Sequence, residues 1–114
     1  MIIKNSEMIK EVKKNMRGGE GEVSLLHYVN KEELKNARLM TRITIPAGAG
    51  IGEHDHVNET EYYIILSGEG IVNDDGVEKT VSPGEVVVTG NGAKHSIRNN
   101  GSADLVMIAV IITY

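Results

Sequence analysis

Residues 61–89 read EYYIILSGEGIVNDDGVEKTVSPGEVVVT, and this stretch decides the fold class. Aspartate and glycine tolerate the positive φ of a tight hairpin, so the DDG triplet at 74–76 predicts a β-hairpin. Short strands separated by glycine-rich turns are typical of an all-β sandwich or barrel. Four strands are expected within this stretch, at 61–66, 71–73, 77–81 and 85–89.

The same pattern continues on both sides of this stretch. Residues 39–45 alternate in their side chains, and the sequence PAGAG at 46–50 ends that strand. One helical turn is expected at 30–34, because Asn30 suits a helix cap and a glutamate follows three residues later. No helix-turn-helix, second domain or internal repeat fits the chain. Further strands are expected at 23–29, 95–99 and 105–113.

The chain length of 114 residues suits one compact domain. We expect a single barrel domain over residues 23–114, preceded by a charged N-terminal arm over residues 1–22. Apolar residues of this arm would share one side of a short amphipathic helix at 6–16. A loosely packed tail or an edge strand fits the same residues, so these alternatives remain open.

The composition argues against several classes of partner. The formal net charge of −4 lacks the basic excess of a nucleic-acid-binding protein. No apolar run is long enough for a signal peptide or a membrane span. The chain has no cysteine, which excludes disulfides and thiolate metal sites and fits a reducing compartment. We therefore expect a cytoplasmic protein without nucleic-acid or membrane partners.

The last expected strand is apolar on both faces, since residues 105–112 read LVMIAVII. One face would pack on the core, so the other face must be covered by another part of the structure. The N-terminal arm or a second subunit could cover it, and we expect a homodimer. The core must consist of Ile, Val, Leu and Met, because the chain has four Tyr and neither Phe nor Trp.

Three of the four histidines form a pattern with one glutamate. His54 and His56 are two residues apart, so both imidazoles would point to the same face of a strand. Glu61 and His95 complete a set of three imidazoles and one carboxylate. This donor set suits Mn, Fe, Ni or Zn better than Ca or Mg, which prefer oxygen ligands. We therefore expect these four residues to bind a divalent metal ion.

Other acidic and histidine residues are expected to lie outside this site. Glu59 is an alternative carboxylate ligand, but its spacing fits less well than that of Glu61. Glu53 and Asp55 have the opposite parity to the two neighbouring histidines, which places them outward in solvent. His27 stands alone and is expected to be an ordinary surface or core residue.

Glycines flank the first three of the expected ligands at regular distances. Five residues separate Gly48 from His54. Four residues separate His56 from Glu61, and six residues then lead to Gly68. These spacings resemble the first sequence motif of the cupin superfamily at every position.

The region around the last ligand resembles the second cupin motif. Gly84 is followed after five residues by Gly90, and Gly92 comes two positions later. Two residues then precede His95, and three more precede Asn99. The family usually has proline where this chain has Gly90. We expect this change to loosen the turn before His95, because proline fixes φ and glycine does not.

The resemblance covers residues 38–113, with 15 residues between the two motifs, as in the most compact single-domain cupins. It implies a double-stranded β-helix, also called a jelly-roll barrel, with a metal ion inside its mouth. Four protein ligands on a six-coordinate ion would leave two positions for water, substrate or O₂. The protein ligands that the resemblance implies are His54, His56, Glu61 and His95.

Parity also predicts which residues lie near the metal. Tyr63 and Ile65 should share the inward face of Glu61. Tyr63 is the candidate catalytic residue, as a proton donor or a hydrogen bond to the substrate, although a core tyrosine would fit the same pattern. Arg42 is expected to point away from the site, and the rest of the pocket is expected to be apolar.

Three functions fit this site. The first is a metal-dependent enzyme acting on a small molecule, with dioxygenase, decarboxylase or isomerase chemistry. Dioxygenase chemistry leads narrowly, because it needs little beyond the metal and an apolar pocket. The alternative is a non-catalytic protein that binds or senses a small molecule, since no acid–base residue is recognisable apart from Tyr63. The last is a structural metal site, which would make the protein unfold when the metal is chelated.

Overall fold

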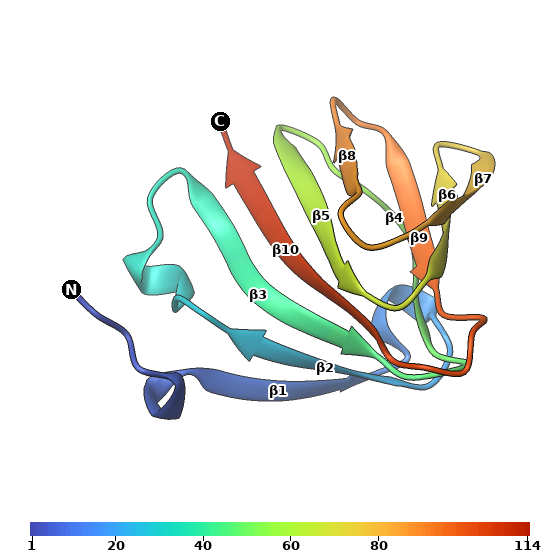
Figure 1. Cartoon of the computed structure of the whole chain (residues 1–114). Coiled ribbons are helices and arrows are strands. Elements are labelled where there is room, and N and C mark those ends of the chain that lie inside the picture. Colours follow the sequence, from blue (N-terminus) through green and yellow to red (C-terminus); the bar gives the residue numbers. More distant parts are fainter.

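The computed structural model describes residues 1–114 as two antiparallel β-sheets (Figure 1). From one edge to the other, the six-stranded sheet contains β1 (Ile9–Lys14), β2 (Glu22–His27), β3 (Ala37–Ile45), β10 (Leu105–Thr113), β5 (Glu59–Ser67) and β8 (Val86–Gly90). In the same sense, the four-stranded sheet contains β4 (Gly50–Asp55), β9 (Lys94–Arg98), β6 (Gly70–Asp74) and β7 (Val77–Val81).

The helical content is limited to three single turns of 3₁₀ helix, of which one lies at 31–33, within the helical turn expected at 30–34. None of these helices has the length and apolar character needed to cross a bilayer. The three turns are η1 (Asn5–Glu7), η2 (Met16–Gly18) and η3 (Lys31–Glu33).

The expected hairpin at 74–76 connects β6 to β7. Asp75 and Gly76 have φ values of 51° and 98°, as a tight hairpin turn requires. The N–H of Gly76 donates a hydrogen bond of 2.8 Å to the side-chain oxygen of Asn73. The chemistry of this short turn therefore sets the register between β6 and β7.

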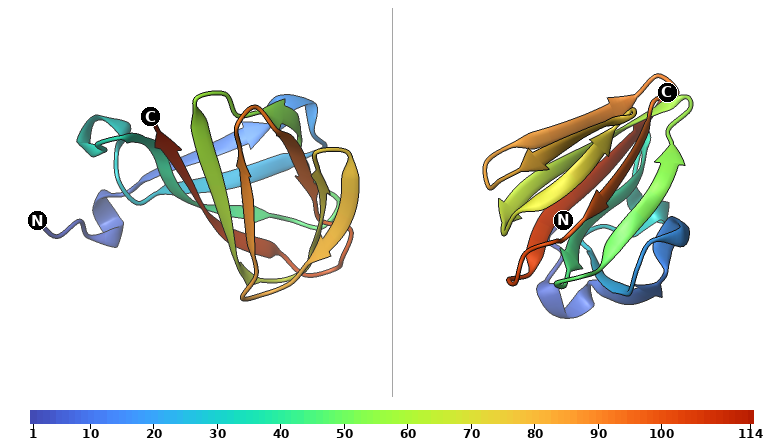
Figure 2. Two further views of the ribbon diagram at one scale, coloured as in Figure 1. Left: turned by 90° about the horizontal axis from the view of Figure 1, so that it is seen from above. Right: turned by 90° about the vertical axis from the view of Figure 1, so that its right-hand side faces the viewer.

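The two sheets face each other and enclose the hydrophobic core (Figure 2). Alternate residues of β10, among them Leu105, Met107 and Ala109, are buried in this core. Val106 and Ile108 point to the opposite face and are half-buried. The all-β jelly-roll fold expected from the sequence is confirmed.

The N-terminal arm contains an edge strand. β1 pairs with β2, from Ile9 opposite His27 to Lys14 opposite Glu22. The helix considered over residues 6–16 is therefore wrong, and the edge-strand alternative is right, because pairing with β2 satisfies the backbone of β1. β1 extends the six-stranded sheet in its own plane and does not cover the outer face of β10 (Figure 1).

Two sequence-based expectations about segments remain predictions. One is the division of the chain into an arm over residues 1–22 and a barrel over residues 23–114. The other is the looser turn at Gly90. This residue ends β8 opposite Thr60, and a side chain there would overlap the Thr60 hydroxyl.

Candidate metal centre

Four side chains from both sheets converge in the space between the sheets. His54 in β4 lies opposite His95 in β9, and His56 follows the end of β4. Glu61 reaches the same point from β5 of the other sheet. One potential ligand atom from each of the four residues lies within 4.8 Å of the others. The fold therefore brings together all four residues that the sequence indicated, in a cluster that could hold a metal ion.

The spacing of these atoms fits adjacent positions around one ion. Nε2 of His95 lies 3.0 Å from Nε2 of both His54 and His56. Oε1 of Glu61 lies 2.9 Å from Nε2 of both His56 and His95, and 3.7 Å from Nε2 of His54. Two ligand atoms at right angles on a metal with bonds of about 2.1 Å are about 3.0 Å apart.

The second nitrogen of each imidazole has a partner outside the cluster. A carbonyl and a carboxylate only accept hydrogen bonds, so Nδ1 of His54 and His56 must donate. Their Nε2 lone pairs then point into the cluster. The three Nδ1 partners are the Gly52 carbonyl at 2.7 Å from His54, a Glu59 carboxylate oxygen at 2.5 Å from His56, and the Thr89 hydroxyl at 2.8 Å from His95.

Acceptor atoms face one another in the cluster, because the Nε2 lone pairs of His54 and His56 point toward the Glu61 carboxylate. Oε1 of Glu61 is buried and receives no hydrogen bond. Buried acceptors that face one another are unfavourable unless a positive charge lies between them. Partners on the second ring nitrogen are also what orients histidines that bind metals. The residues therefore fit a divalent metal ion by their chemistry as well as by their spacing.

The ionisation of the cluster couples metal binding to pH. Burial disfavours the charged form of Glu61, but the three imidazoles outweigh it and hold the pKa of this carboxyl well below its usual range. Burial lowers the pKa of His95. Burial also acts to lower the pKa of His56, but the carboxylates of Glu61 and Glu59 raise it above its usual value. An ionised carboxylate and neutral imidazoles are the forms that bind metals, so protons compete with the metal as the pH falls.

Glu59, which was considered as an alternative metal ligand, lies outside the cluster of four residues. Its carboxylate accepts two hydrogen bonds of 2.7 Å from Nε and Nη2 of Arg38, and it also accepts the Nδ1 proton of His56. The Arg38 guanidinium is the main cause that lowers the pKa of Glu59 to about 2. Glu59 therefore fixes the orientation of an expected ligand instead of joining the cluster. Glu53, Asp55 and Arg42 are exposed, as parity predicted, and do not contribute.

Tyr63 lies in the wall of the site. It is buried, and its ring stacks on the His95 imidazole with a centroid separation of 4.8 Å and an interplanar angle of 12°. Burial raises the pKa of Tyr63 well above its usual value, the charge of Glu61 adds to this rise, and the charge of Arg17 opposes it. The hydroxyl therefore stays protonated near neutral pH. The catalytic role expected for Tyr63 stays a prediction.

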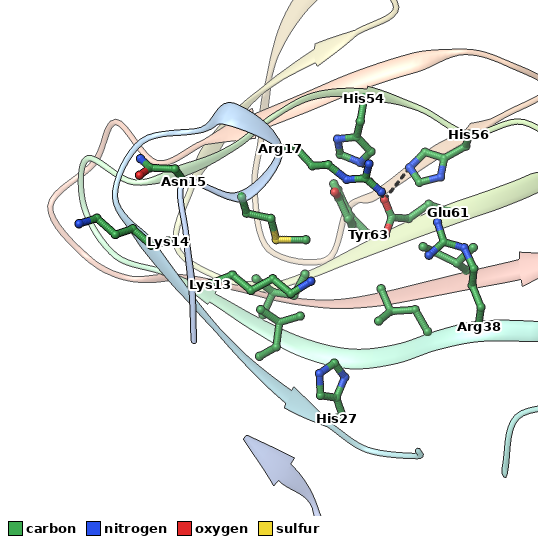
Figure 3. A pocket seen from close by; sticks show the side chains of 15 residues that line it. Lys13, Lys14, Asn15, Arg17, His27, Arg38, His54, His56, Glu61 and Tyr63 are labelled. Atoms are coloured by element: carbon green, nitrogen blue, oxygen red, sulfur yellow. Dashed lines mark ion pairs between the residues drawn. The ribbon is translucent and has the colours of Figure 1, made fainter. Parts of the chain in front are cut away.

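A cavity of about 470 Å³ opens in front of the cluster (Figure 3). Its outer part carries Lys13, Lys14, Arg17 and Arg38, so the expectation of an otherwise apolar pocket is wrong. The cations come mainly from β1 and the connection that follows it, and not from the barrel strands on which that expectation was based. His27 also lines this cavity, with its Nε2 2.9 Å from a Glu11 carboxylate oxygen.

Comparison with known proteins identifies the family. Residues 41–111 match the family model of the cupin domain. The oxalate-binding protein of Thermotoga maritima is 44% identical over 113 residues, which cover 98% of this chain and 93% of the relative. The crystal structure of a predicted oxalate decarboxylase from Thermotoga maritima has a TM-score of 0.93 and 43% identity, with 100% of both chains covered. The crystal structure of a cupin sugar phosphate isomerase from Silicibacter pomeroyi shares the fold alone, at a TM-score of 0.80 and 16% identity, over 100% of this chain and 76% of that one. This chain belongs to the cupins.

Proposed function

We propose that this protein binds a divalent metal ion and uses it to hold oxalate or a closely related small dicarboxylic acid. The observation that carries this proposal is the convergence of the three Nε2 atoms on a Glu61 carboxylate oxygen that is buried and has no hydrogen-bond partner. Mn, Fe, Ni and Zn all suit this donor set, and metal supply decides among them. The ion would be held by His54, His56, Glu61 and His95.

The ligand class is supported by charge and by similarity. Carboxylate oxygens are good ligands for a metal with positions left open by the protein. Lys13, Arg17 and Arg38 place positive charge around the path to that metal. The relative at 44% identity is named for oxalate binding. The structural role considered for the metal ranks last, because the barrel has its own apolar core.

Metal analysis and thermal unfolding test this proposal together. The protein as purified, or after reloading with Mn²⁺, should contain about one equivalent of metal per chain. Oxalate should then raise the melting temperature of the loaded protein and have no effect after chelation, because it stabilises only a state that binds it. The His54→Ala, His95→Ala double variant should show neither effect. A loaded protein whose melting temperature ignores oxalate would overturn the proposed ligand.

Decarboxylation is a second candidate function, and the position of Tyr63 favours it. Loss of CO₂ from a dicarboxylic acid breaks a carbon–carbon bond and leaves an electron pair on the remaining fragment, which must take up a proton. A metal, when bound, would withdraw electron density from the carboxylate. Tyr63 stacks its ring on His95 and keeps a protonated hydroxyl, which could supply that proton. Formate release from oxalate by the loaded wild type, lost in Tyr63→Phe with oxalate affinity retained, would support this role.

Dioxygenase chemistry is no longer preferred among the enzyme functions. That preference relied on an apolar pocket, and the mouth of this cavity is cationic. The non-catalytic alternative, a protein that binds or senses a small acid, follows from the same site. It predicts oxalate binding without formate, so an assay for formate separates the two functions.

We also propose that two copies associate through the outer face of the six-stranded sheet. Val106 and Ile108 lie on this face, and Val86 and Val88 of the edge strand β8 are 52% and 58% exposed. The N-terminal arm leaves this face uncovered, which favours the second subunit over the arm as its cover. Light scattering should give a dimer mass for the wild type and a monomer mass for Val88→Lys. The cytoplasmic location stays a prediction.

A further inference from the structure

The connection between β1 and β2, at residues 15–21, packs its backbone directly against β4. A Cβ atom at Gly19 would overlap the Gly50 carbonyl, and a Cβ atom at Gly52 would overlap the Arg17 carbonyl. Glycine is therefore needed on both sides of this contact, because any side chain would push the two segments apart. The contact holds the connection beside β4, the strand that carries His54 of the candidate metal centre.

The connection also holds itself in one conformation. The Asn15 side chain donates a hydrogen bond of 3.0 Å to the Gly19 carbonyl, and the Asn15 N–H donates one of 2.8 Å to the Gly21 carbonyl. Within this turn Arg17 has φ 54° and ψ 29°, in the left-handed region that L side chains rarely adopt. Such conformations persist where the surroundings enforce them and are common at functional sites.

The Arg17 side chain extends from this turn into the mouth of the cavity, toward the side of Glu61 and His54 (Figure 3). Its guanidinium forms no ion pair and no hydrogen bond. Arg38, across the mouth, is by contrast bound to Glu59 through two hydrogen bonds. The structure thus holds a cation with free donors in front of the cluster.

We infer that Arg17 is a specificity-determining residue that selects dicarboxylic over monocarboxylic acids. The inference rests on the proposed function. A divalent ion bound by one carboxylate and three neutral imidazoles keeps one net positive charge. One carboxylate of a ligand neutralises that charge, and a dicarboxylic acid has a second negative charge left over. The planar guanidinium of Arg17 matches a carboxylate with two parallel hydrogen bonds, whereas a monocarboxylic acid would leave it unpaired.

A second explanation for Arg17 makes different predictions. If the charge of Arg17 only balanced that of Glu61, its removal would change metal affinity. The removal would then weaken the binding of monocarboxylic and dicarboxylic acids alike. If Arg17 binds the second carboxylate of the ligand, its removal should weaken the binding of oxalate but not of formate. The ratio of the two ligand affinities, measured at constant metal content, therefore separates the explanations.

The test measures the affinity of Mn²⁺-loaded protein for oxalate by calorimetry, with formate measured in competition against oxalate. The variants are Arg17→Asn, which removes the charge and suits a positive φ, and Arg17→Lys, which keeps the charge without the planar fork. Lys10→Asn is the matched control, because Lys10 is exposed on β1 and outside the cavity. Metal content and melting temperature are recorded for each variant.

We expect Arg17→Asn to weaken oxalate binding about tenfold, the loss typical of a charge-assisted hydrogen bond. Formate affinity and metal content should stay within twofold, Arg17→Lys should recover part of the loss, and Lys10→Asn should match the wild type. Unchanged oxalate affinity in Arg17→Asn, or an equal loss for formate, would overturn the role of Arg17 alone. Failure of the loaded wild type to bind oxalate would overturn the proposed function and this role with it.

Discussion

The inner and outer walls of the cavity differ in burial, in charge and in how their side chains are held. The inner wall, which we define as His54, His56, Glu61 and His95, comes from β4, the residue that follows it, β5 and β9. It is largely buried, and His95 does not itself line the cavity. The outer wall, which we define as Lys13, Arg17 and Arg38, lies on β1, η2 and β3 and is charged and more exposed. Each inner imidazole has a second partner that fixes its orientation, whereas Arg17 in the outer wall has no partner at all.

This difference separates two tasks that one site must perform. Metal binding requires several donors at fixed distances, which packed strands of both sheets provide. Choice of ligand requires charges that can meet an incoming anion, and such charges remain hydrated until it arrives. Changes in the inner wall should therefore abolish metal binding, and changes in the outer wall should alter ligand choice with the metal retained.

The largest effect is expected from removal of an inner-wall ligand. His95→Ala deletes the imidazole whose Nε2 lies 3.0 Å from Nε2 of both His54 and His56. One metal ligand is lost, together with the group that lies between the other two histidines. Metal content measured by elemental analysis should fall from about one equivalent to near zero. His27→Ala removes the one histidine outside the inner wall and should keep the full equivalent. Equal metal content in both variants would contradict the division into two walls.

A smaller loss is expected from Glu59→Gln, which keeps the shape of the side chain and removes its charge. The variant weakens the hold on Nδ1 of His56 without touching a ligand atom. Changes of this kind typically lower metal affinity about 10–100-fold. Competition with a chelator measures this change. Glu53→Gln, on the exposed side of β4, is the matched control and should leave the affinity unchanged.

The inner wall could be predicted from the sequence because its signals are local. The two-residue spacing of His54 and His56 works in any strand, and the turn at 74–76 needs only its own residues. Thr89 was missed, although it lies directly opposite Glu61 in the neighbouring strand β8. Its contact with His95 depends on cross-strand register, which no local pattern contains.

The outer wall could not be predicted for a related reason. The N-terminal arm has too few apolar residues to distinguish a helix from an edge strand, and pairing with β2 decides between them. Arg17 reaches the site only because Gly19 and Gly52 allow two distant segments to touch. A close approach of two backbones leaves no periodic signal in a single sequence. The charge of the mouth therefore becomes visible only in the folded chain.

The glycine contact itself offers a way to move the outer wall as a unit. Gly19→Ala would force the connection at 15–21 away from β4, because its Cβ would overlap the Gly50 carbonyl. We expect a loss of about 1–3 kcal/mol in the free energy of unfolding and an oxalate affinity lowered about tenfold, as in Arg17→Asn. Metal content should be retained. Gly18→Asn is the control, because no atom lies near that site and asparagine tolerates its φ of 82°.

Glu59 links Arg38 of the outer wall to His56 of the inner wall, and its contribution should appear as a pH dependence of stability. In the folded protein, mainly Arg38 and also His56 lower the pKa of Glu59 from 4.5 to about 2, so the unfolded chain binds more protons between these values. The resulting stabilisation is present above pH 4.5 and is lost as the pH falls toward 2. Between pH 6 and pH 3, urea unfolding of chelated wild type should lose about 1–2 kcal/mol more than Glu59→Gln. A parallel loss in the two proteins would show that ionised Glu59 contributes no pH-dependent stability and serves only to orient His56.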